Sequence, residues 1–436
     1  MANQKEAQLY NTSDDKEIIA LLAGLNTGDD ADLFESSMNE LKGLAKAAGM
    51  KVCAMITQNS PSVNQATLVG SGKVEEIKAR IGYDDADIVI FNSTLTPMQI
   101  RNLERALDRE VIDKTALILQ IFSERARTRE ALLQVEYARL EYMLPRLSHM
   151  RSGLTRQGGA SGSKSSKGAG EKKLELDRRH IEHRLAELRR ELKEMDKERA
   201  TQREKRLSSP FPKIALAGYT NAGKSTLMNH LLGITGSSDE DKLVMEKDML
   251  FATLDTSVRK ISPQGHRTFL LSDTVGFIDD LPTSLVKAFR STLEEIKYAD
   301  LILEVIDYSD PDHRRHIEVT DSTLNEIGAG TVPKIYVYNK GDIADRIELP
   351  FVRDNNIYMS AKNDTGMEEL LSLIDKVLAE DETQVSLMIP YKRGDIFSRI
   401  NDSCKVTSSK YLEDGIEVTA FLRKADQNRY KEYLLS

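Results

Sequence analysis

Hydrophobic and polar positions in the first 115 residues form short apolar runs separated by amphipathic stretches. A short apolar run predicts a buried strand, and an apolar residue at every third or fourth position predicts a helix with one buried face. The expected strands are 51–57 and 87–91, with a third at 116–121 just beyond this part, and the expected helices are 37–48, 73–81 and 96–107. Because strands that alternate with helices are typical of parallel sheets, we expect residues 1–115 to form a small parallel α/β domain.

The middle of the chain has a different periodicity, with apolar residues spaced alternately by four and three on both sides of a glycine-rich segment. The first series is Leu133, Tyr137, Leu140, Leu144 and Leu147, and the second is Ile181, Leu185, Leu188, Leu192 and Met195. Each series forms a seam along one helix, and helices this polar need a partner to be stable. We therefore expect an antiparallel helical hairpin over 116–208, with a Gly/Ser/Lys-rich loop at about 150–171.

The alternation of strands and helices returns after Pro210 and Pro212. Five apolar runs are expected to be strands: 214–217, 269–271, 301–306, 335–338 and 357–359. They predict a second α/β domain over residues 209–382. Two further runs, at 385–389 and 416–422, predict a small α+β domain over 383–436. The fold class expected for the chain is therefore α/β.

A phosphate-binding loop follows the strand expected at 214–217. Its residues are Gly218, Tyr219, Thr220, Asn221, Ala222, Gly223, Lys224 and Ser225, and Thr226 continues into a helical run. This order matches G-x-x-x-x-G-K-[ST] in the strand–loop–helix context that the motif requires. Glycines let successive backbone N–H groups point at phosphate oxygens, and the start of the helix favours negative charge. Lys224 is expected to contact the β- and γ-phosphates, and the Ser225 hydroxyl to ligate Mg²⁺.

A second motif ends the strand expected at 269–271. It reads Asp273, Thr274, Val275 and Gly276. Asp273 is expected to hold Mg²⁺ through water, and the N–H of Gly276 to sense the γ-phosphate. An aspartate before a turn is common, but its distance downstream of the phosphate-binding loop favours the functional interpretation.

Two further segments predict which base the bound nucleotide carries. Asn339, Lys340, Gly341 and Asp342 follow one expected strand, and Ser360, Ala361 and Lys362 follow the next. The Asp342 carboxylate can accept two hydrogen bonds from guanine, whereas adenine offers no such pair of donors and would leave the carboxylate unpaired. Lys340 can cover the base with its aliphatic stem, and the second segment can offer an N–H to guanine O6. Together with the phosphate motifs, these residues predict GTP hydrolysis by in-line attack of water.

Two positions affect how GTP hydrolysis is expected to be catalysed. Phe277 follows the second motif where many small GTPases carry a glutamine that orients the attacking water, so we expect slow intrinsic turnover that a partner accelerates. Asn221 occupies a position where some GTPases bind a monovalent cation, and K⁺ there could neutralise developing charge. A loop-stabilising role for Asn221 remains an equal alternative.

Composition limits the remaining choices. The net charge is −8, so any nucleic-acid contact must come from a local basic patch. Two distant cysteines, Cys53 and Cys404, offer neither a metal site nor a disulfide framework. The chain contains no apolar run of membrane-spanning length, and its N-terminus resembles no targeting peptide. We therefore expect a cytoplasmic protein.

With these motifs placed, the chain resembles the HflX family of ribosome-associated GTPases over nearly its whole length. The motifs that carry the resemblance are GYTNAGKSTL, LFATLD, LSDTVGFIDDLP and YNKGD, with Val69–Ile77, Arg101–Glu104, Gln134–Ala138, Leu144–Leu147 and Leu174–Arg179 outside the GTPase segment. The resemblance implies that Thr253, in preference to Thr256, ligates Mg²⁺ when the γ-phosphate is present. Lys224, Thr253 and Gly276 would then frame the reacting phosphate.

The resemblance also implies a partner. Members of the family bind the 50S ribosomal subunit and can split ribosomes, including ribosomes stalled under stress, with the helical hairpin and its loop reaching 23S rRNA. The residues agree, because a basic group surrounds the loop: Arg139, Arg146, Arg151, Arg156, Lys164, Lys167, Lys172 and Lys173. The alternative functions are a GTP-dependent ribosome assembly factor and an RNA-binding anti-association factor.

Two details of the resemblance affect binding. Ala169 stands where family members usually carry proline, and serines and lysines interrupt the glycine-rich loop, which bears on how the loop engages rRNA. Some members are also reported to bind ATP through the N-terminal domain. Gly70–Lys73 is the candidate for a weak ATP site here, and the start of a helix is the competing interpretation.

Overall fold

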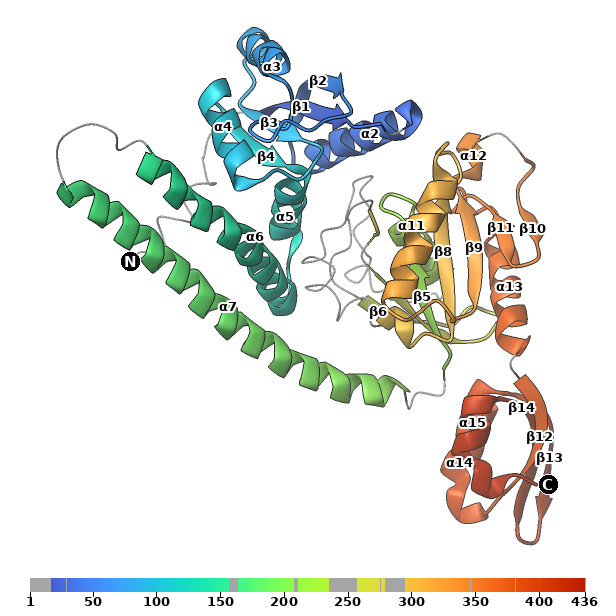
Figure 1. Cartoon of the computed structure of the whole chain (residues 1–436). Coiled ribbons are helices and arrows are strands. Elements are labelled where there is room, and N and C mark those ends of the chain that lie inside the picture. Colours follow the sequence, from blue (N-terminus) through green and yellow to red (C-terminus); the bar gives the residue numbers. More distant parts are fainter. Residues whose placement is uncertain are drawn as a thin grey trace. The chain divides into compact units, whose positions relative to one another are not determined.

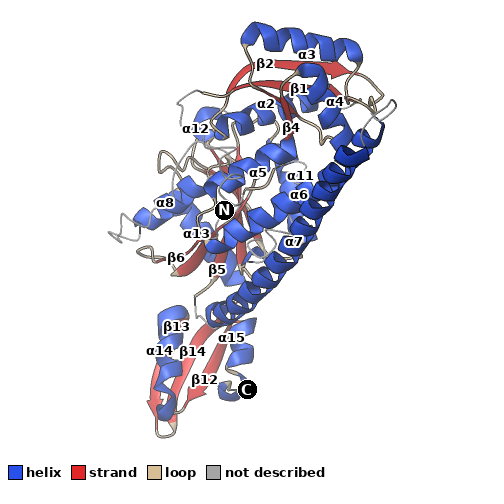
Figure 2. Cartoon of the chain, turned by 90° about the vertical axis from the view of Figure 1, so that its left-hand side faces the viewer, coloured by secondary structure: helices blue, strands red, loops and turns tan. Residues whose placement is uncertain are grey.

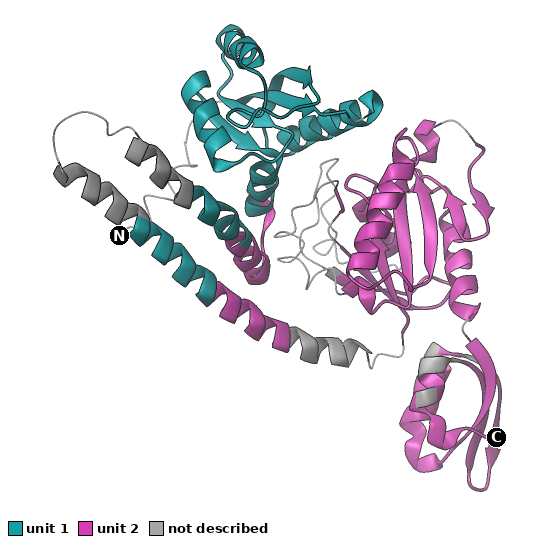
Figure 3. Ribbon diagram, in the orientation of Figure 1, with its two compact units in different colours: residues 1–124, 138–186 teal, residues 125–137, 187–436 magenta. Residues whose placement is uncertain are grey.

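The computed structural model (Figure 1) describes residues 17–28, 30–156, 164–207, 211–234, 257–274, 276–278, 295–344, 347–380 and 382–435. Helices and strands alternate along most of this chain (Figure 2). It divides into two compact units, one formed by residues 1–124 and 138–186 and the other by residues 125–137 and 187–436 (Figure 3). No helix among the described residues is both long and apolar enough to cross a membrane.

The N-terminal sheet has four parallel strands in the order β2-β1-β3-β4. Its strands are β1 (Ile19–Asn26), β2 (Lys51–Asn59), β3 (Ile88–Phe91) and β4 (Glu110–Asp113), connected through α2 (Ala31–Ala47), α3 (Ser71–Asp84) and α4 (Pro97–Leu107). The parallel α/β fold predicted for this part of the chain is therefore confirmed. Strands β1 and β4 were not among the expected strands: β1 contains small residues within its apolar run, and β4 has only four residues.

The strand expected at 116–121 is wrong, because these residues lie in α5 (Lys114–Arg125). Leu117, Ile118, Ile121 and Phe122 are completely buried. Their spacing places them on one side of a helix, whereas a strand would turn Leu117 and Ile118 to opposite faces. A short apolar run cannot distinguish a buried strand from a buried helix by itself.

The middle of the chain contains two long helices, α6 (Arg129–Arg156) and α7 (Lys164–Leu207), which lie side by side (Figure 1 and Figure 2). Tyr137 accepts a hydrogen bond from Arg189 at 2.9 Å. The helices extend into both ends of the segment expected as a loop at about 150–171. Each glycine in a helix costs only about 1 kcal/mol, so a glycine-rich composition does not by itself end a helix.

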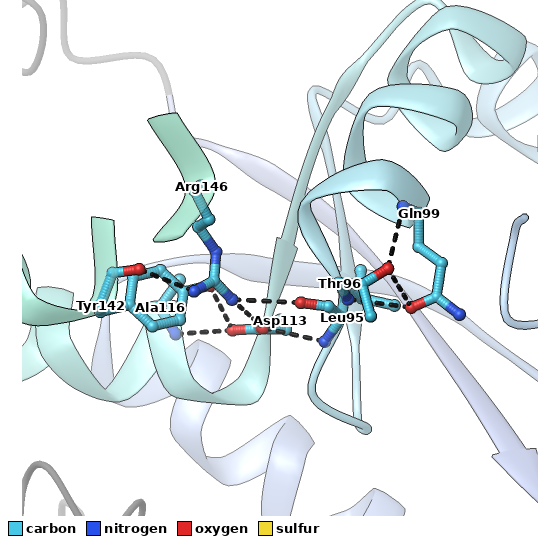
Figure 4. Close-up of polar contacts among 7 residues, drawn as sticks. All are labelled: Leu95, Thr96, Gln99, Asp113, Ala116, Tyr142 and Arg146. Carbon is cyan, nitrogen blue, oxygen red and sulfur yellow. Dashed lines mark hydrogen bonds and ion pairs between the residues drawn. The ribbon is translucent and has the colours of Figure 1, made fainter. Parts of the chain in front are cut away.

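Helix α6 is attached to the first unit through the buried carboxylate of Asp113, at the end of β4 (Figure 4). This carboxylate accepts hydrogen bonds from the N–H groups of Leu95 (3.0 Å) and Ala116 (2.9 Å). It also accepts bonds from the Tyr142 hydroxyl (2.8 Å) and from Arg146 (3.1 Å). Burial, and then the Asp113 charge, raise the pKa of Tyr142, so its hydroxyl keeps its proton and remains a donor. The contact neutralises a buried negative charge with a cation from α6.

The second unit contains a seven-stranded sheet in the order β10-β11-β9-β8-β5-β7-β6. Its strands are β5 (Lys213–Ala217), β6 (Ser257–Ile261), β7 (Phe269–Asp273), β8 (Leu301–Asp307), β9 (Lys334–Asn339), β10 (Phe351–Arg353) and β11 (Asn356–Tyr358). The associated helices are α8 (Lys224–Ile234), α11 (His313–Glu326), α12 (Gly341–Ala344) and α13 (Met367–Glu380). All five strands expected here are confirmed, and β6 and β10 pair antiparallel with β7 and β11.

The remaining strands form a three-stranded antiparallel sheet in the order β12-β14-β13. They are β12 (Glu382–Ile389), β13 (Lys405–Leu412) and β14 (Gly415–Arg423), and the helices α14 (Gly394–Ser403) and α15 (Lys424–Arg429) lie on one face of the sheet (Figure 1). Short 3-10 helices occupy Tyr391–Arg393 and Lys431–Tyr433. The two strands expected in this part of the chain are confirmed.

Replacing Arg146 with alanine is expected to destabilise the protein by about 3 kcal/mol, because the Asp113 charge would stay buried without its cation. The measurement is urea unfolding followed by circular dichroism. Arg139→Ala, which removes an exposed arginine from the same helix, is the control and should change stability by less than about 0.5 kcal/mol. Equal losses in the two variants would contradict this account of Asp113.

Candidate functional site

The phosphate-binding loop connects β5 to α8 through two glycines that no other residue could replace. Gly218 has φ +136°, and a Cβ there would lie 2.2 Å from the carbonyl oxygen of Val305. Gly223 has φ +93°, and a Cβ there would lie 2.2 Å from Nδ2 of Asn339. Asn221 also has a positive φ, +61°. The loop therefore curves tightly enough for its N–H groups to surround an anion.

Lys224 is buried in the concave side of this loop, with its side chain turned back toward the backbone. Its Nζ donates to the carbonyl oxygens of Gly218 at 2.9 Å and Tyr219 at 2.6 Å. Burial lowers the pKa of Lys224 to about 8, and the nearby Asp273 charge opposes this shift. A desolvated ammonium gains strongly from a bound phosphate, because its water has already been removed.

The side-chain oxygens of two residues that the sequence assigns to a metal site lie close together beside the loop. The hydroxyl of Ser225 is 3.4 Å from Oδ2 of Asp273, whose side chain is completely buried at the end of β7. Thr274 fixes this strand end by donating its hydroxyl to the carbonyl oxygen of Leu216 at 2.7 Å. A hydroxyl and a carboxylate are hard oxygen ligands and fit Mg²⁺. Thr253, the third expected ligand, and Val275 lie outside the described residues.

The chain after Asp273 returns directly to the phosphate-binding loop. A Cβ at Gly276 would lie 2.9 Å from Cα of Thr220 and 3.0 Å from Nζ of Lys224. The N–H of Phe277 donates to the carbonyl oxygen of Gly218 at 3.1 Å, and the N–H of Thr220 donates to the carbonyl oxygen of Phe277 at 2.8 Å. The phenyl ring of Phe277 is buried. Gly276 is therefore placed next to Lys224, where both could contact the same phosphate group.

Asn339 joins three of the predicted segments. Its Nδ2 donates to the carbonyl oxygen of Ala222 in the phosphate-binding loop, and its Oδ1 accepts from the N–H of Ala361, both at 2.9 Å. The side chain is only 4% exposed, so both bonds form away from water. The sequence predicts that Asn339 is a nucleotide-binding residue. In the structure its amide connects the phosphate-binding loop to the loop that follows β11.

The remaining residues predicted to recognise the base lie at the ends of β9 and β11. Lys340 has φ +60° and donates to Asp307 at 2.7 Å, while Asp342 is exposed in the first turn of α12. Ser360 is buried and Lys362 is exposed. Thr226 lies in the first turn of α8. The described members of the predicted site thus lie at the carboxyl ends of neighbouring strands, along one edge of the sheet, as expected for parallel strands.

Sequence reasoning missed three residues that support this site. Asp307 accepts the Lys340 bond, and the N–H of Tyr308 donates to the carbonyl oxygen of Asn339 at 2.9 Å. The ring of Tyr219 stacks on His316 of α11. An aspartate at the end of the apolar strand 301–306 was a signal for Asp307, but no sequence pattern connects His316 to Tyr219.

The Gly70–Lys73 segment, proposed from the sequence as a second nucleotide site, begins α3. The N–H of Gly70 donates to Oε1 of Gln58 at 2.9 Å, and Lys73 forms an ion pair with Glu76 at 2.6 Å. A phosphate there would have to compete with both of these contacts.

Three known protein families match segments that together cover most of the chain. Residues 35–123 match the family described as GTP-binding GTPase N-terminal, and residues 125–206 match GTP-binding GTPase Middle Region. Residues 213–340 match 50S ribosome-binding GTPase. The last match contains the phosphate-binding loop, the Asp273 segment and Asn339.

Similar curated proteins carry the name GTPase HflX. The protein from Caldanaerobacter subterraneus is 42% identical over 97% of this chain and 95% of its own length. The protein from Lacrimispora saccharolytica is 41% identical over 92% of this chain and 93% of its own. That from Alkalihalophilus pseudofirmus is 44% identical over 85% of this chain and 84% of its own.

The lowered pKa of Lys224 predicts a pH dependence of nucleotide binding. Above pH about 8 the free protein carries a neutral Lys224, whereas bound phosphates favour the ammonium, so binding must take up a proton. The Kd for GDP, measured by calorimetry, is expected to rise about tenfold from pH 7 to pH 9. Lys224→Arg keeps its charge throughout this range and is expected to remove the slope. A Kd for the unchanged protein that is constant over this range would contradict the prediction.

Proposed function

The chain belongs to the HflX family of GTPases, and on this premise we propose that it binds the 50S ribosomal subunit and couples GTP binding and hydrolysis to the splitting or rescue of ribosomes. The observation that carries the proposal is the match of residues 213–340 to 50S ribosome-binding GTPases, in a chain that also has the middle region of this family. We place this activity in the cytoplasm, where ribosomes translate.

We assign the phosphate side of the site to the residues gathered around the phosphate-binding loop. The N–H groups of residues 218–226 would hold the β-phosphate, and Lys224 and the N–H of Gly276 would contact the γ-phosphate. Ser225, Asp273 and Thr253 would hold Mg²⁺, which supplies positive charge to the phosphate oxygens when bound. Catalysis by these residues consists of positioning the γ-phosphate and stabilising charge that develops on it.

We assign guanine recognition to Asp342, with Lys340 covering the base. The N–H of Ala361 already donates to Asn339. We therefore assign the contact with guanine O6 to the neighbouring N–H of Lys362. The phenyl ring of Phe277 offers no hydrogen bond to water, so the geometry favours a partner that completes the arrangement around the attacking water.

The paired helices α6 and α7 are our candidate for the rRNA-binding region. Among the basic residues expected there, Arg139 is exposed, whereas Arg146 forms an ion pair with Asp113. The other cations of this group, and Ala169 in the altered loop, have side chains outside the described residues. Among the described residues of this group, we therefore assign the neutralisation of an RNA phosphate to Arg139.

The first test is GTP turnover with and without purified 50S subunits. Stimulation by at least about tenfold is expected, because an external partner must complete a site that has Phe277 in place of a water-orienting residue. Lys224→Ala is the matched control and should abolish turnover in both conditions. Unchanged turnover at saturating 50S, with GTP still bound, would overturn the ribosomal partner and leave the GTPase assignment intact.

We also propose that K⁺ binds near Asn221, whose left-handed backbone places it at the exposed tip of the phosphate-binding loop. A cation there would offset negative charge that develops on the phosphate oxygens. Turnover in KCl is expected to exceed turnover in NaCl by several-fold, and Asn221→Ala should remove the difference. Equal rates of the unchanged protein in the two salts would contradict K⁺ binding.

A further inference from the structure

The first turn of α11 contacts the phosphate-binding loop through an aromatic pair. The rings of Tyr219 and His316 lie 3.9 Å apart between centroids and only 10° from parallel. Tyr219 is 8% exposed, and the side chain of His316 is 15% exposed. Two flat rings in this geometry have a preferred orientation, which an aliphatic contact of the same area would not impose.

Tyr219 also holds the lysine of the loop. Its carbonyl oxygen accepts the 2.6 Å hydrogen bond from Nζ of Lys224. The residues on either side have other restraints: Gly218 packs against the backbone of Val305, and the N–H of Thr220 donates to Phe277. The stacked ring is therefore a side-chain restraint on the residue whose carbonyl oxygen orients Lys224.

His316 also lies near the segment that follows β8. Its Nδ1 lies 3.9 Å from Oδ2 of Asp310, and the N–H of Asp310 donates to the carbonyl oxygen of Asp307 at 3.3 Å. Asp307 in turn accepts the hydrogen bond from Lys340. The end of β8 and the start of α11 thus contact both the phosphate-binding loop and the segment that contains Asn339.

We propose that His316 is a positioning residue for GTP hydrolysis. Its imidazole ring holds the Tyr219 ring, and this fixes the peptide carbonyl that accepts a hydrogen bond from Lys224, the residue assigned to the γ-phosphate. Since His316 contacts the phosphate-binding loop through Tyr219, we expect its effect to fall mainly on the rate of the chemical step. Binding of GDP depends on the segments Asn339–Asp342 and Ser360–Lys362 expected to bind guanine, on the backbone N–H groups of the loop and on the Lys224 charge, and the substitution removes none of these.

The test is single-turnover hydrolysis of GTP by the full chain, together with the Kd for GDP. His316→Ala is expected to lower the rate constant by about fivefold and to change the Kd by less than about twofold. His316→Phe restores a flat ring and should recover most of the rate. His316→Leu fills the space without a flat face and should stay slow. Glu318→Ala, on an exposed position of the same helix, is the control and should match the unchanged protein.

A double-mutant cycle separates positioning from a general loss of folding. If the two rings act as a unit, Tyr219→Leu combined with His316→Ala should be no slower than the slower single variant. Melting temperatures should be the same for His316→Phe and His316→Leu although their rates differ. Equal rates for His316→Phe and His316→Leu, or strictly additive effects in the cycle, would overturn the proposal.

Discussion

The nucleotide site depends on one buried amide, that of Asn339. Its nitrogen and oxygen each make a 2.9 Å hydrogen bond, and these bonds connect loops that follow β5, β9 and β11. The amide fits there because Gly223 has no Cβ. Loss of either bond would leave a buried polar group unsatisfied, so the side chain holds the spacing between phosphate recognition and base recognition at a fixed value. The remaining motifs are useful only at that spacing.

Aspartates at strand ends, two of them fully buried and Asp307 partly buried, have different roles in the two units. Asp113 ends β4 and is neutralised by Arg146 from a helix that follows later in the chain. Asp273 ends β7 and lies 3.4 Å from the Ser225 hydroxyl, and we propose that the two share Mg²⁺. Asp307 ends β8 and receives the charge of Lys340. The neighbouring groups decide whether such a carboxylate is structural or chemical, because a buried charge needs a compensating charge in either case.

Much of the fold was predictable because strands and helices with long periodic patterns bury one face whatever their partners are. The wrong strand at 116–121 and the missed strand β4 have a common cause. Residues 116–121 are apolar enough for a strand, yet Leu117, Ile118, Ile121 and Phe122 pack from one side of α5. β4 is short, and its alignment with β3 supplies the pairing that its own four residues do not signal. Local patterns specify burial, whereas sheet pairing depends on residues far away in the sequence.

The sequence by itself determined that the chain is a GTPase and predicted the roles of the phosphate-binding loop, the Asp273 segment and the Asn339–Asp342 segment, because each motif is contiguous and its residue types have few other uses. The tertiary structure decided which of their groups are already engaged. Arg146 forms an ion pair with Asp113, the N–H of Ala361 donates a hydrogen bond to Asn339, and the ring of Tyr219 stacks on His316. These partners lie 33, 22 and 97 positions apart in the sequence. Contacts over such separations depend on how strands and helices pack, and no local pattern encodes that packing.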